Sequence, residues 1–283
     1  MFGTVLNYVV RHPRRIAIAL VRDPARGFER LHERLMQRRE DNAEVHVHQP
    51  VLDWERQLHA LMDIDWPCSE GPAFWQVWRD TVAELEARGI SAGPESFAGY
   101  NDGDAALVRA CWCIVRHTRP EHVIETGVGH GFTSRIILEA MHRNGAGHLF
   151  SIDLPPLDPV MRAQIGIAVP ASLHNRWELV SGSSRRHLAP LLSRLGTIDL
   201  FVHDSLHTER NVTFELECAW RHLRRQGFLV VDDIDSNAGF DAFVRSTAGV
   251  GSTLVCEAEP LRPDVRRFNQ KGQLGLIQKG PLP

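Results

Sequence analysis

Three carboxylates and an imidazole follow two apolar runs of the chain, and their types and spacing suit chemistry. Asp204 ends the run "IDLFVHD" and His207 comes three residues later, whereas Asp232 and Asp233 end the run "FLVVDD". If both runs are parallel strands, their carboxyl ends meet at the sheet edge where open α/β folds bind ligands. Carboxylates grouped there suit a hard divalent cation such as Mg²⁺. Histidine titrates near neutral pH, so His207 is a candidate general base.

Each of these assignments has a plainer alternative. Neighbouring residues of an extended strand point to opposite faces, so Asp232 and Asp233 are not expected to be ligands together. The pair could instead cap a helix beginning near residue 238, and His207 could simply bond to backbone. His203 and His207 resemble a zinc pair in spacing, but the break from strand to loop removes the helical geometry that such a pair needs.

A glycine-rich loop lies between an apolar run and a helical pattern in "VIETGVGHGFTSRIILEA". Its glycines are Gly127, Gly129 and Gly131. Such a loop lets a ligand approach the backbone, and the start of the following helix favours an anion or polar group. The dinucleotide fingerprint GxGxxG does not fit, because the third glycine comes one residue early. A nicotinamide oxidoreductase is therefore the less favoured reading.

A carboxylate follows the next apolar run, where a nucleoside would need it. Asp153 ends "HLFSID", 24 residues after Gly129. An acid at the end of the second strand can accept hydrogen bonds from both ribose hydroxyls. The loop and this acid together predict a nucleoside-containing ligand.

The pattern ExGxGxG followed by an acid at the second strand's end resembles the class I S-adenosylmethionine-dependent methyltransferases. The resemblance implies that Glu125 faces the amino-acid part of the cofactor and that the glycines let the backbone approach it. It also implies that Asp153 holds the ribose and that Ser183, in "SGSS", lies on the adenine side. The other residues assigned to the cofactor site are Thr126, Phe132 and Asp204.

The second half, "IDLFVHDSLHTERNVTFELECAWRHLRRQGFLVVDDID", resembles the subgroup that includes cephalosporin-hydroxylase-like and macrolide-sugar O-methyltransferases. The shared residues are Asp204, His207, Gly227, Asp232 and Asp233, and the resemblance covers about residues 100–283. It implies methylation of a small-molecule or sugar hydroxyl. His207 and Asp204 would be catalytic, with Mg²⁺ at Asp204, Asp232 and Asp233 where a metal assists. The chain departs from the catechol-type pattern, which has Asn after the second acid, at Ile234.

Apolar runs alternate with helical patterns from about residue 103 onward. This rhythm predicts an α/β, Rossmann-like fold with a seven-stranded, mostly parallel sheet and an antiparallel pair at the sheet edge. The expected strands are 122–126, 148–153, 177–182, 198–204, 228–233, 253–258 and 274–278. The expected helices are 51–62, 72–88, 104–117, 131–143, 184–195, 209–225 and 238–247.

Composition and charge limit the classes of partner. The 283 residues carry a net charge of −3 and are 43% apolar, which is typical of a globular protein. No apolar window is long enough for a membrane span, and the charged start lacks a signal-peptide core, so a cytoplasmic location is expected. The five cysteines form no CxxC pair and are expected to be reduced, packed thiols. Arginine makes up nearly all of the basic residues, which indicates a GC-rich, bacterial source.

The first hundred residues are expected to form a helical extension, and residues 101–283 the methyltransferase-like domain. Residues 1–39 hold nine arginines against three acidic residues, so the rest of the chain carries −9. Such an arm can contact a membrane surface, but packing on its own domain is favoured, and the acidic balance argues against nucleic acid. The extension would cap the site or join a homo-oligomer. The remaining alternatives are an iron hydroxylase using Asp204, His207 and Asp233, and a non-catalytic binding protein on the same fold.

Overall fold

A seven-stranded sheet forms the centre of the computed structural model, which describes residues 18, 21, 23–40, 46, 48–90, 104–247, 251–259 and 272–280. Its strands run in spatial order β3-β2-β1-β4-β5-β7-β6, and β7 is antiparallel to both β5 and β6. The predicted fold is confirmed, with the antiparallel strand lying one place in from the edge. The strands are β1 (His122–Thr126), β2 (His148–Asp153), β3 (Trp177–Ser181), β4 (Ile198–His203), β5 (Leu223–Val231), β6 (Gly251–Glu257) and β7 (Gln273–Lys279).

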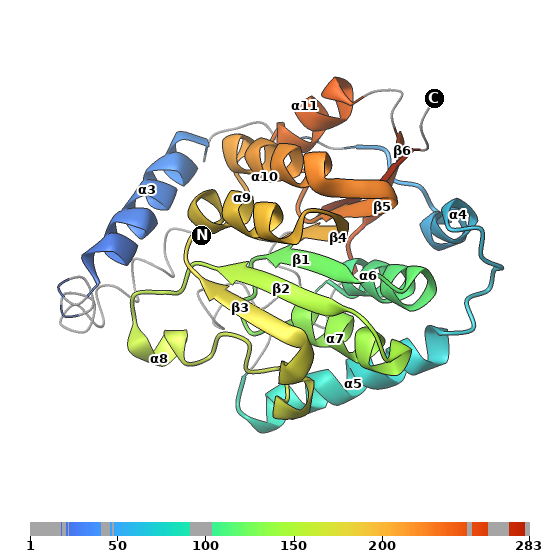
Figure 1. Ribbon diagram of the computed structural model, residues 1–283, viewed down its shortest axis with the longest axis horizontal. Coiled ribbons are helices and arrows are strands. Elements are labelled where there is room, and N and C mark those ends of the chain that lie inside the picture. The colour runs from blue at the N-terminus through green and yellow to red at the C-terminus, as the bar shows by residue number, and fades with distance from the viewer. Residues whose placement is uncertain are drawn as a thin grey trace.

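Helices cover both faces of this sheet (Figure 1). One face packs against α4 (Trp54–Leu61), α5 (Gly71–Ala87), α6 (Ala105–Thr118) and α7 (Phe132–Asn144). The other face packs against α9 (Ser184–Leu195), α10 (Glu209–His222) and α11 (Gly239–Ser246). Three further helical segments complete the described elements: α3 (Pro24–Glu40), α8 (Pro159–Arg162) and the 3₁₀ helix η2 (Ala171–Arg176).

Strand side chains alternate between the two cores, as a sheet covered on both faces requires. Val123 faces the core with α6 and α7, whereas the next residue, Ile124, faces the core with α9 and α10. Phe201 and Val202 divide in the same way on β4. The continuous apolar runs of the sequence follow from this two-sided burial.

Strand β5 begins earlier and ends earlier than the sequence predicts. It starts at Leu223 and ends at Val231, so the predicted helix 209–225 is too long and the predicted strand 228–233 is placed too late. Asp232 and Asp233 therefore lie beyond the strand, and Asp233 has a left-handed backbone with φ 47°. The expectation that only one of these acids can face a ligand rested on both being in an extended strand, so it does not apply to them.

The N-terminal extension contributes directly to the core. Trp54, Phe74 and Trp78 are buried against α6 and α7, and Trp66 and Trp75 are 43% and 37% exposed. Residues 1–17, 19, 20 and 22 of the basic arm lie outside the described part of the chain. Within the described residues, every helix is too short or too polar to cross a membrane.

Candidate active site

The glycine loop joins β1 to α7, and its glycines serve different physical ends. Gly127 has φ 85°, and a Cβ there would overlap the backbone carbonyl of Asp204. Gly131 also has φ 85°, and a Cβ on Gly131 would lie 2.9 Å from the Cα of Gly166. Gly129 differs, because a Cβ there would meet nothing within 4 Å. Two glycines therefore let protein backbones pack together, and the open space where a ligand can approach lies at Gly129.

Asp153, at the end of β2, turns its carboxylate toward this loop. Its Oδ2 accepts hydrogen bonds from the backbone N–H of Val128 at 2.8 Å and of Gly129 at 3.2 Å. Both side-chain hydrogen bonds that the described residues give Asp153 use this one oxygen. Oδ1 is left to accept from a ligand, as the ribose assignment requires.

Glu125 lies beneath the loop rather than on an open surface. Its side chain is fully buried, and Oε2 accepts hydrogen bonds from the hydroxyls of Ser134 and Ser151, both at 2.6 Å. Among the described residues, Oε1 is buried without a hydrogen-bond partner. Burial raises the pKa of Glu125 to about 7. The orphaned oxygen leaves one strong acceptor under the loop, where the cofactor's amino-acid part is expected.

The other residues assigned to the cofactor have different surroundings. Ser183 begins α9 without capping it through its hydroxyl, which leaves that hydroxyl available to a ligand. Phe132 is buried and packs on the ring of Trp78 at 5.1 Å, so its side chain belongs to the core. The Thr126 hydroxyl donates to Oε2 of Glu215 at 2.6 Å. For Phe132 and Thr126, contact with a cofactor would have to come from the backbone.

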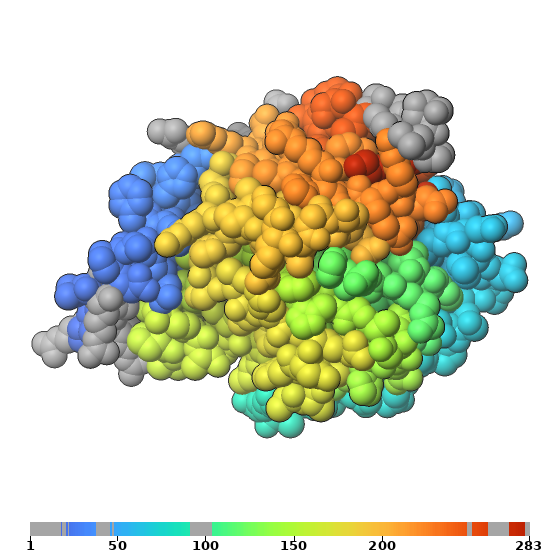
Figure 2. Space-filling view, in the orientation of Figure 1, coloured from blue at the N-terminus to red at the C-terminus, as the bar shows by residue number. Residues whose placement is uncertain are grey.

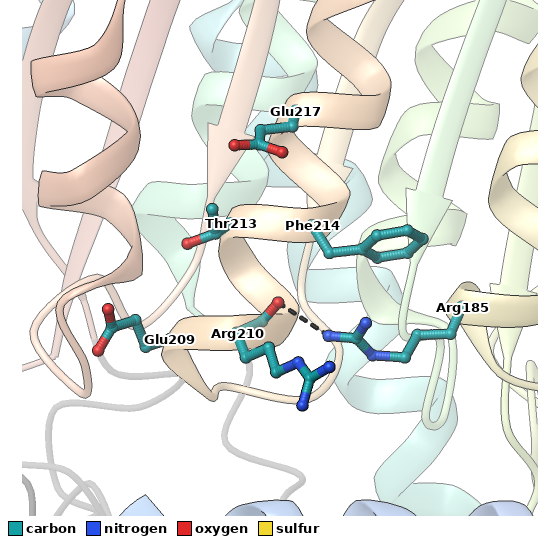
Figure 3. Close-up of a pocket in the computed structure, with 6 residues that line it drawn as sticks. All are labelled: Arg185, Glu209, Arg210, Thr213, Phe214 and Glu217. Carbon is teal, nitrogen blue, oxygen red and sulfur yellow. Dashed lines mark hydrogen bonds between the residues drawn. The ribbon is translucent and has the colours of Figure 1, made fainter.

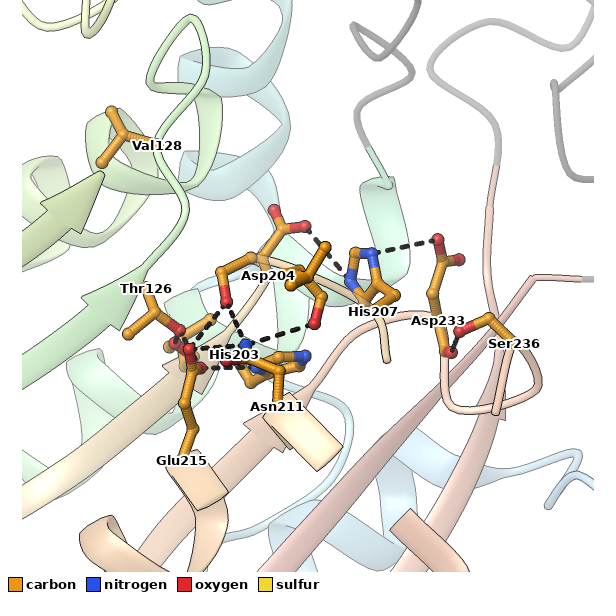
Figure 4. Close-up of polar contacts among 12 residues, drawn as sticks. Thr126, Val128, His203, Asp204, His207, Asn211, Glu215, Asp233 and Ser236 are labelled. Atoms are coloured by element: carbon orange, nitrogen blue, oxygen red, sulfur yellow. Dashed lines mark hydrogen bonds and ion pairs between the residues drawn. The ribbon is translucent and has the colours of Figure 1, made fainter. Parts of the chain in front are cut away.

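The strand-end cluster, defined as Asp204, His207, Asp232 and Asp233, gathers at the carboxyl ends of β4 and β5. One ligand atom each of Asp204, His207 and Asp232 lies within 4.8 Å of the others. His207 lies between two acids, with Nε2 at 3.9 Å from Oδ1 of Asp204 and Nδ1 at 3.9 Å from Oδ2 of Asp233 (Figure 4). The four residues that the sequence analysis singled out are thus brought together.

The electrostatics of the cluster favour a neutral imidazole beside carboxyl groups that hold a proton or a cation. Burial lowers the pKa of His207 to about 4. Burial, and then the charges of Asp233 and Glu125, raise the pKa of Asp204 well above its usual range. Since carboxylates so close repel one another, a shared proton or a divalent cation would relieve the repulsion. The carboxylate oxygens of this cluster are the kind of ligand that Mg²⁺ prefers.

A buried pair behind the cluster was not anticipated as part of the site. Nδ1 of His203 lies 2.7 Å from Oε2 of Glu215, and both side chains are fully buried. Ser205 and Asn211 bond to the other carboxylate oxygen of Glu215 at 2.8 and 2.9 Å (Figure 4). The sequence of α10 has an ordinary amphipathic pattern, and Glu215 occupies one of its buried positions. A charged residue at a position where the pattern expects an apolar one was the only sequence feature that could have indicated this pair.

Helix α3 lies beyond the carboxyl ends of β1 and β2 (Figure 1). Arg30 of α3 donates to the backbone carbonyls of Leu154 and Pro155, just past β2. Burial raises the pKa of Glu33, on the same helix, to about 7, and the negative charges of Asp153 on β2 and Glu215 on α10 act in the same direction. The extension therefore reaches the edge of the sheet that carries the site.

A separate hollow lies on the surface of α9 and α10 (Figure 3), two helices that lie on the face seen in Figure 2. Arg185 crosses it, donating to the backbone carbonyl of Arg210 at 2.8 Å and stacking over Phe214 at 4.8 Å. None of the residues assigned to the cofactor or the cluster lines it. Its lining residues are Arg185, Glu209, Arg210, Thr213, Phe214 and Glu217.

A family model described as a methyltransferase domain matches residues 124–234, which run from β1 to just beyond the strand-end cluster. No curated protein matches the chain in sequence.

Solved methyltransferases share the fold. The O-methyltransferase TomG from Streptomyces achromogenes, involved in tomaymycin synthesis and solved with S-adenosylmethionine, aligns with a TM-score of 0.53 and 14% identity over 72% of this chain and 90% of its own. The O-methyltransferase from Bacillus cereus, solved with S-adenosylhomocysteine, aligns with a TM-score of 0.51 and 12% identity over 78% of this chain and 96% of its own. Residues 124–234 therefore match a methyltransferase-domain model, and the chain shares its fold with O-methyltransferases solved with S-adenosylmethionine or S-adenosylhomocysteine.

Proposed function

We propose that the protein transfers a methyl group from S-adenosylmethionine to a hydroxyl of a small molecule or a sugar. One observation supports this above the others: the glycine loop and the strand-end cluster are packed directly together. Gly127 lies against the backbone of Asp204, and the N–H of Asp204 donates to the carbonyl of Thr126 at 2.9 Å. A cofactor over Gly129 and an acceptor at the cluster would be immediate neighbours, as an in-line displacement requires.

Asp153 and the open space at Gly129 fit the cofactor, which when bound supplies an electrophilic methyl group on a sulfonium. Oδ1 of Asp153 would accept from the ribose hydroxyls, and Glu125 would lie under the amino-acid part. Ser183 would lie on the adenine side. Helix α3 would limit the access of water to this edge of the sheet.

His207 is the proposed general base. Nε2 is buried and, within the described part of the chain, makes no hydrogen bond. In the tautomer with the proton on Nδ1, Nε2 would carry the lone pair that accepts a proton. The acceptor oxygen forms a bond to the methyl carbon as the carbon–sulfur bond breaks, and the hydroxyl proton goes to Nε2. Asp233, whose Oδ2 lies 3.9 Å from Nδ1, would stabilise the imidazolium that forms, and Asp204 lies 3.9 Å from Nε2 on the other side of the ring.

A divalent cation is the second device by which this cluster could activate a hydroxyl. Asp204, Asp232 and Asp233 would be its ligands, and the cation would lower the pKa of a bound hydroxyl. An iron hydroxylase fits less well, because the cluster combines one imidazole with carboxylates rather than two imidazoles with one carboxylate. A homo-oligomer, a membrane contact of the basic arm and a cytoplasmic location stay predictions.

The test is a methyl-transfer assay with labelled S-adenosylmethionine and a panel of sugars and phenols, run with Mg²⁺ and with a chelator. Matched amino sugars serve as controls for the acceptor atom. Formation of a methyl ether, lost in His207→Gln, supports the proposal. Methylation of the amine instead of the hydroxyl contradicts it, and activity unchanged by the chelator contradicts the metal route.

A further inference from the structure

Two thiols and two imidazoles gather on the opposite side of the domain from the strand-end cluster. His59 lies on α4, Cys68 precedes α5, and Cys113 and His117 are four residues apart on α6. Helix α6 ends just before β1 begins, so His117 lies near the amino ends of the strands. We call these four residues the thiol–imidazole cluster.

The distances within this cluster approach those of a metal site. One ligand atom each of His59, Cys68 and Cys113 lies within 4.8 Å of the others. Nε2 of His117 lies 3.2 Å from Sγ of Cys68. In tetrahedral zinc with Zn–S of about 2.3 Å and Zn–N of about 2.0 Å, sulfur and nitrogen ligands lie about 3.5 Å apart.

His59 has the environment of a metal ligand. Its side chain is fully buried, and Nδ1 lies 2.7 Å from the backbone carbonyl of Glu55, to which it must donate. This bond fixes the tautomer and leaves a lone pair on Nε2. In the part of the chain that the structure describes, Nε2 is buried with no hydrogen-bond partner. A histidine that binds a metal through one ring nitrogen is usually oriented by a hydrogen bond that its other ring nitrogen donates to a carbonyl or carboxylate.

The thiols complete a suitable donor set. The thiolate is the form of cysteine that binds metals. Cys113 is 4% exposed, and Cys68 and His117 are partly exposed, which leaves a path for an ion.

We propose that His59, Cys68, Cys113 and His117 bind one zinc ion in a tetrahedral site with two sulfur and two nitrogen ligands. Four protein ligands leave no open position, so the site is structural rather than catalytic. It ties the segment between α4 and α5 to α6, and thereby fastens the N-terminal extension to the domain. Trp66, whose ring lies 5.1 Å from that of His59, covers one side.

The test is the metal content of the reduced, purified full-length protein, together with the absorption of a Co²⁺-substituted sample. The expected result is one zinc per chain and a cobalt spectrum with tetrahedral ligand-field bands and thiolate charge transfer. Cys68→Ser and Cys113→Ser should each lose most of the zinc. Cys218→Ser is the matched control, since this partly buried cysteine lies outside the cluster, and Asp204→Asn controls for metal held at the strand-end cluster.

The proposal is overturned by wild-type protein that takes up neither Zn²⁺ nor Co²⁺, and also by zinc that remains at full stoichiometry in Cys68→Ser. Zinc lost from Asp204→Asn but kept in Cys68→Ser would also overturn it, by placing the metal at the other end of the sheet. The cobalt spectrum of the wild-type protein keeps the test decisive if a cysteine variant fails to fold.

Discussion

Oδ1 of Asp204 lies 3.9 Å from Nε2 of His207, and Oδ2 of Asp233 lies 3.9 Å from the other ring nitrogen. Both separations are too long for hydrogen bonds. The imidazole is thus held between two acids without being bonded to either. The proposed chemistry would place an acceptor hydroxyl or a cation between these groups.

Replacing His207 with Gln should lower kcat about 100-fold or more, because the acceptor hydroxyl loses its base. Binding of S-adenosylhomocysteine should stay unchanged, since His207 lies on the acceptor side. His222→Gln, at the far end of α10, is the matched control and should keep full activity. Steady-state kinetics with calorimetric binding separates these effects. A His207→Gln enzyme with undiminished kcat would remove the residue from the mechanism.

Replacing Asp153 with Asn should weaken cofactor binding about ten- to a hundredfold, because the charged acceptor for the ribose is lost. Asn keeps an oxygen for the loop N–H groups. Asp199 provides a close control: its Oδ2 also accepts from two backbone N–H groups, those of Glu121 and His122, at the other end of β4. Asp199→Asn should leave cofactor affinity unaltered. Equal affinity for wild type and Asp153→Asn in calorimetric titration would contradict the ribose assignment.

The glycine loop predicts opposite outcomes for two alanine substitutions. Gly127→Ala should destabilise the fold by about 3 kcal/mol, because the methyl group overlaps the Asp204 carbonyl at a positive φ. Gly129→Ala should cost about 1 kcal/mol for its positive φ alone and should instead impair cofactor binding. Urea unfolding and calorimetry on both variants check this. The same stability loss in both would mean that Gly129 is not in open space.

The stability of the fold should depend on Glu215 in a pH-dependent way. Burial alone would raise the pKa of Glu215, but His203 and hydroxyl donors outweigh it and lower the pKa to about 2. A carboxyl whose folded pKa is lowered stabilises the fold above its unfolded value of 4.5, and this contribution is lost as pH falls toward 2. Glu215→Gln should therefore cost about 3 kcal/mol at pH 7 and much less near pH 2.

The exposed Glu217, two residues further along α10, is the control for that measurement. Glu217→Gln should change the free energy of unfolding by less than about 0.5 kcal/mol at either pH. A cost for Glu215→Gln that is equal at both pH values would show that lost packing, and not the charge, causes it.

The sequence predicted the sheet well because its strands are buried on both faces and read as continuous apolar runs. It misplaced β5, since the polar start of that strand, "RRQ", continues the helical pattern of α10. That error affected the prediction for Asp232 and Asp233, because two neighbouring residues must point to opposite faces only while both lie in the strand.

A motif carries the candidate site residues Gly129, Asp153 and Asp204, and their roles stay predictions. The pairing of Glu215 with His203 was not predicted, because a buried charge pair on a helix and a strand leaves no local signature. The thiol–imidazole cluster was missed for a similar reason. Its cysteines form no CxxC pair, and only the packing of α4 on α6 brings His59 and Cys68 to Cys113.

The most direct test of the account is calorimetric titration of the purified protein with S-adenosylhomocysteine, with NAD⁺ as the control, each with and without Mg²⁺. The account predicts micromolar binding of S-adenosylhomocysteine, about −8 kcal/mol, and no binding of NAD⁺. The affinity should fall in Asp153→Asn. Absence of S-adenosylhomocysteine binding under every condition, from protein shown to be folded, would contradict the proposed cofactor site.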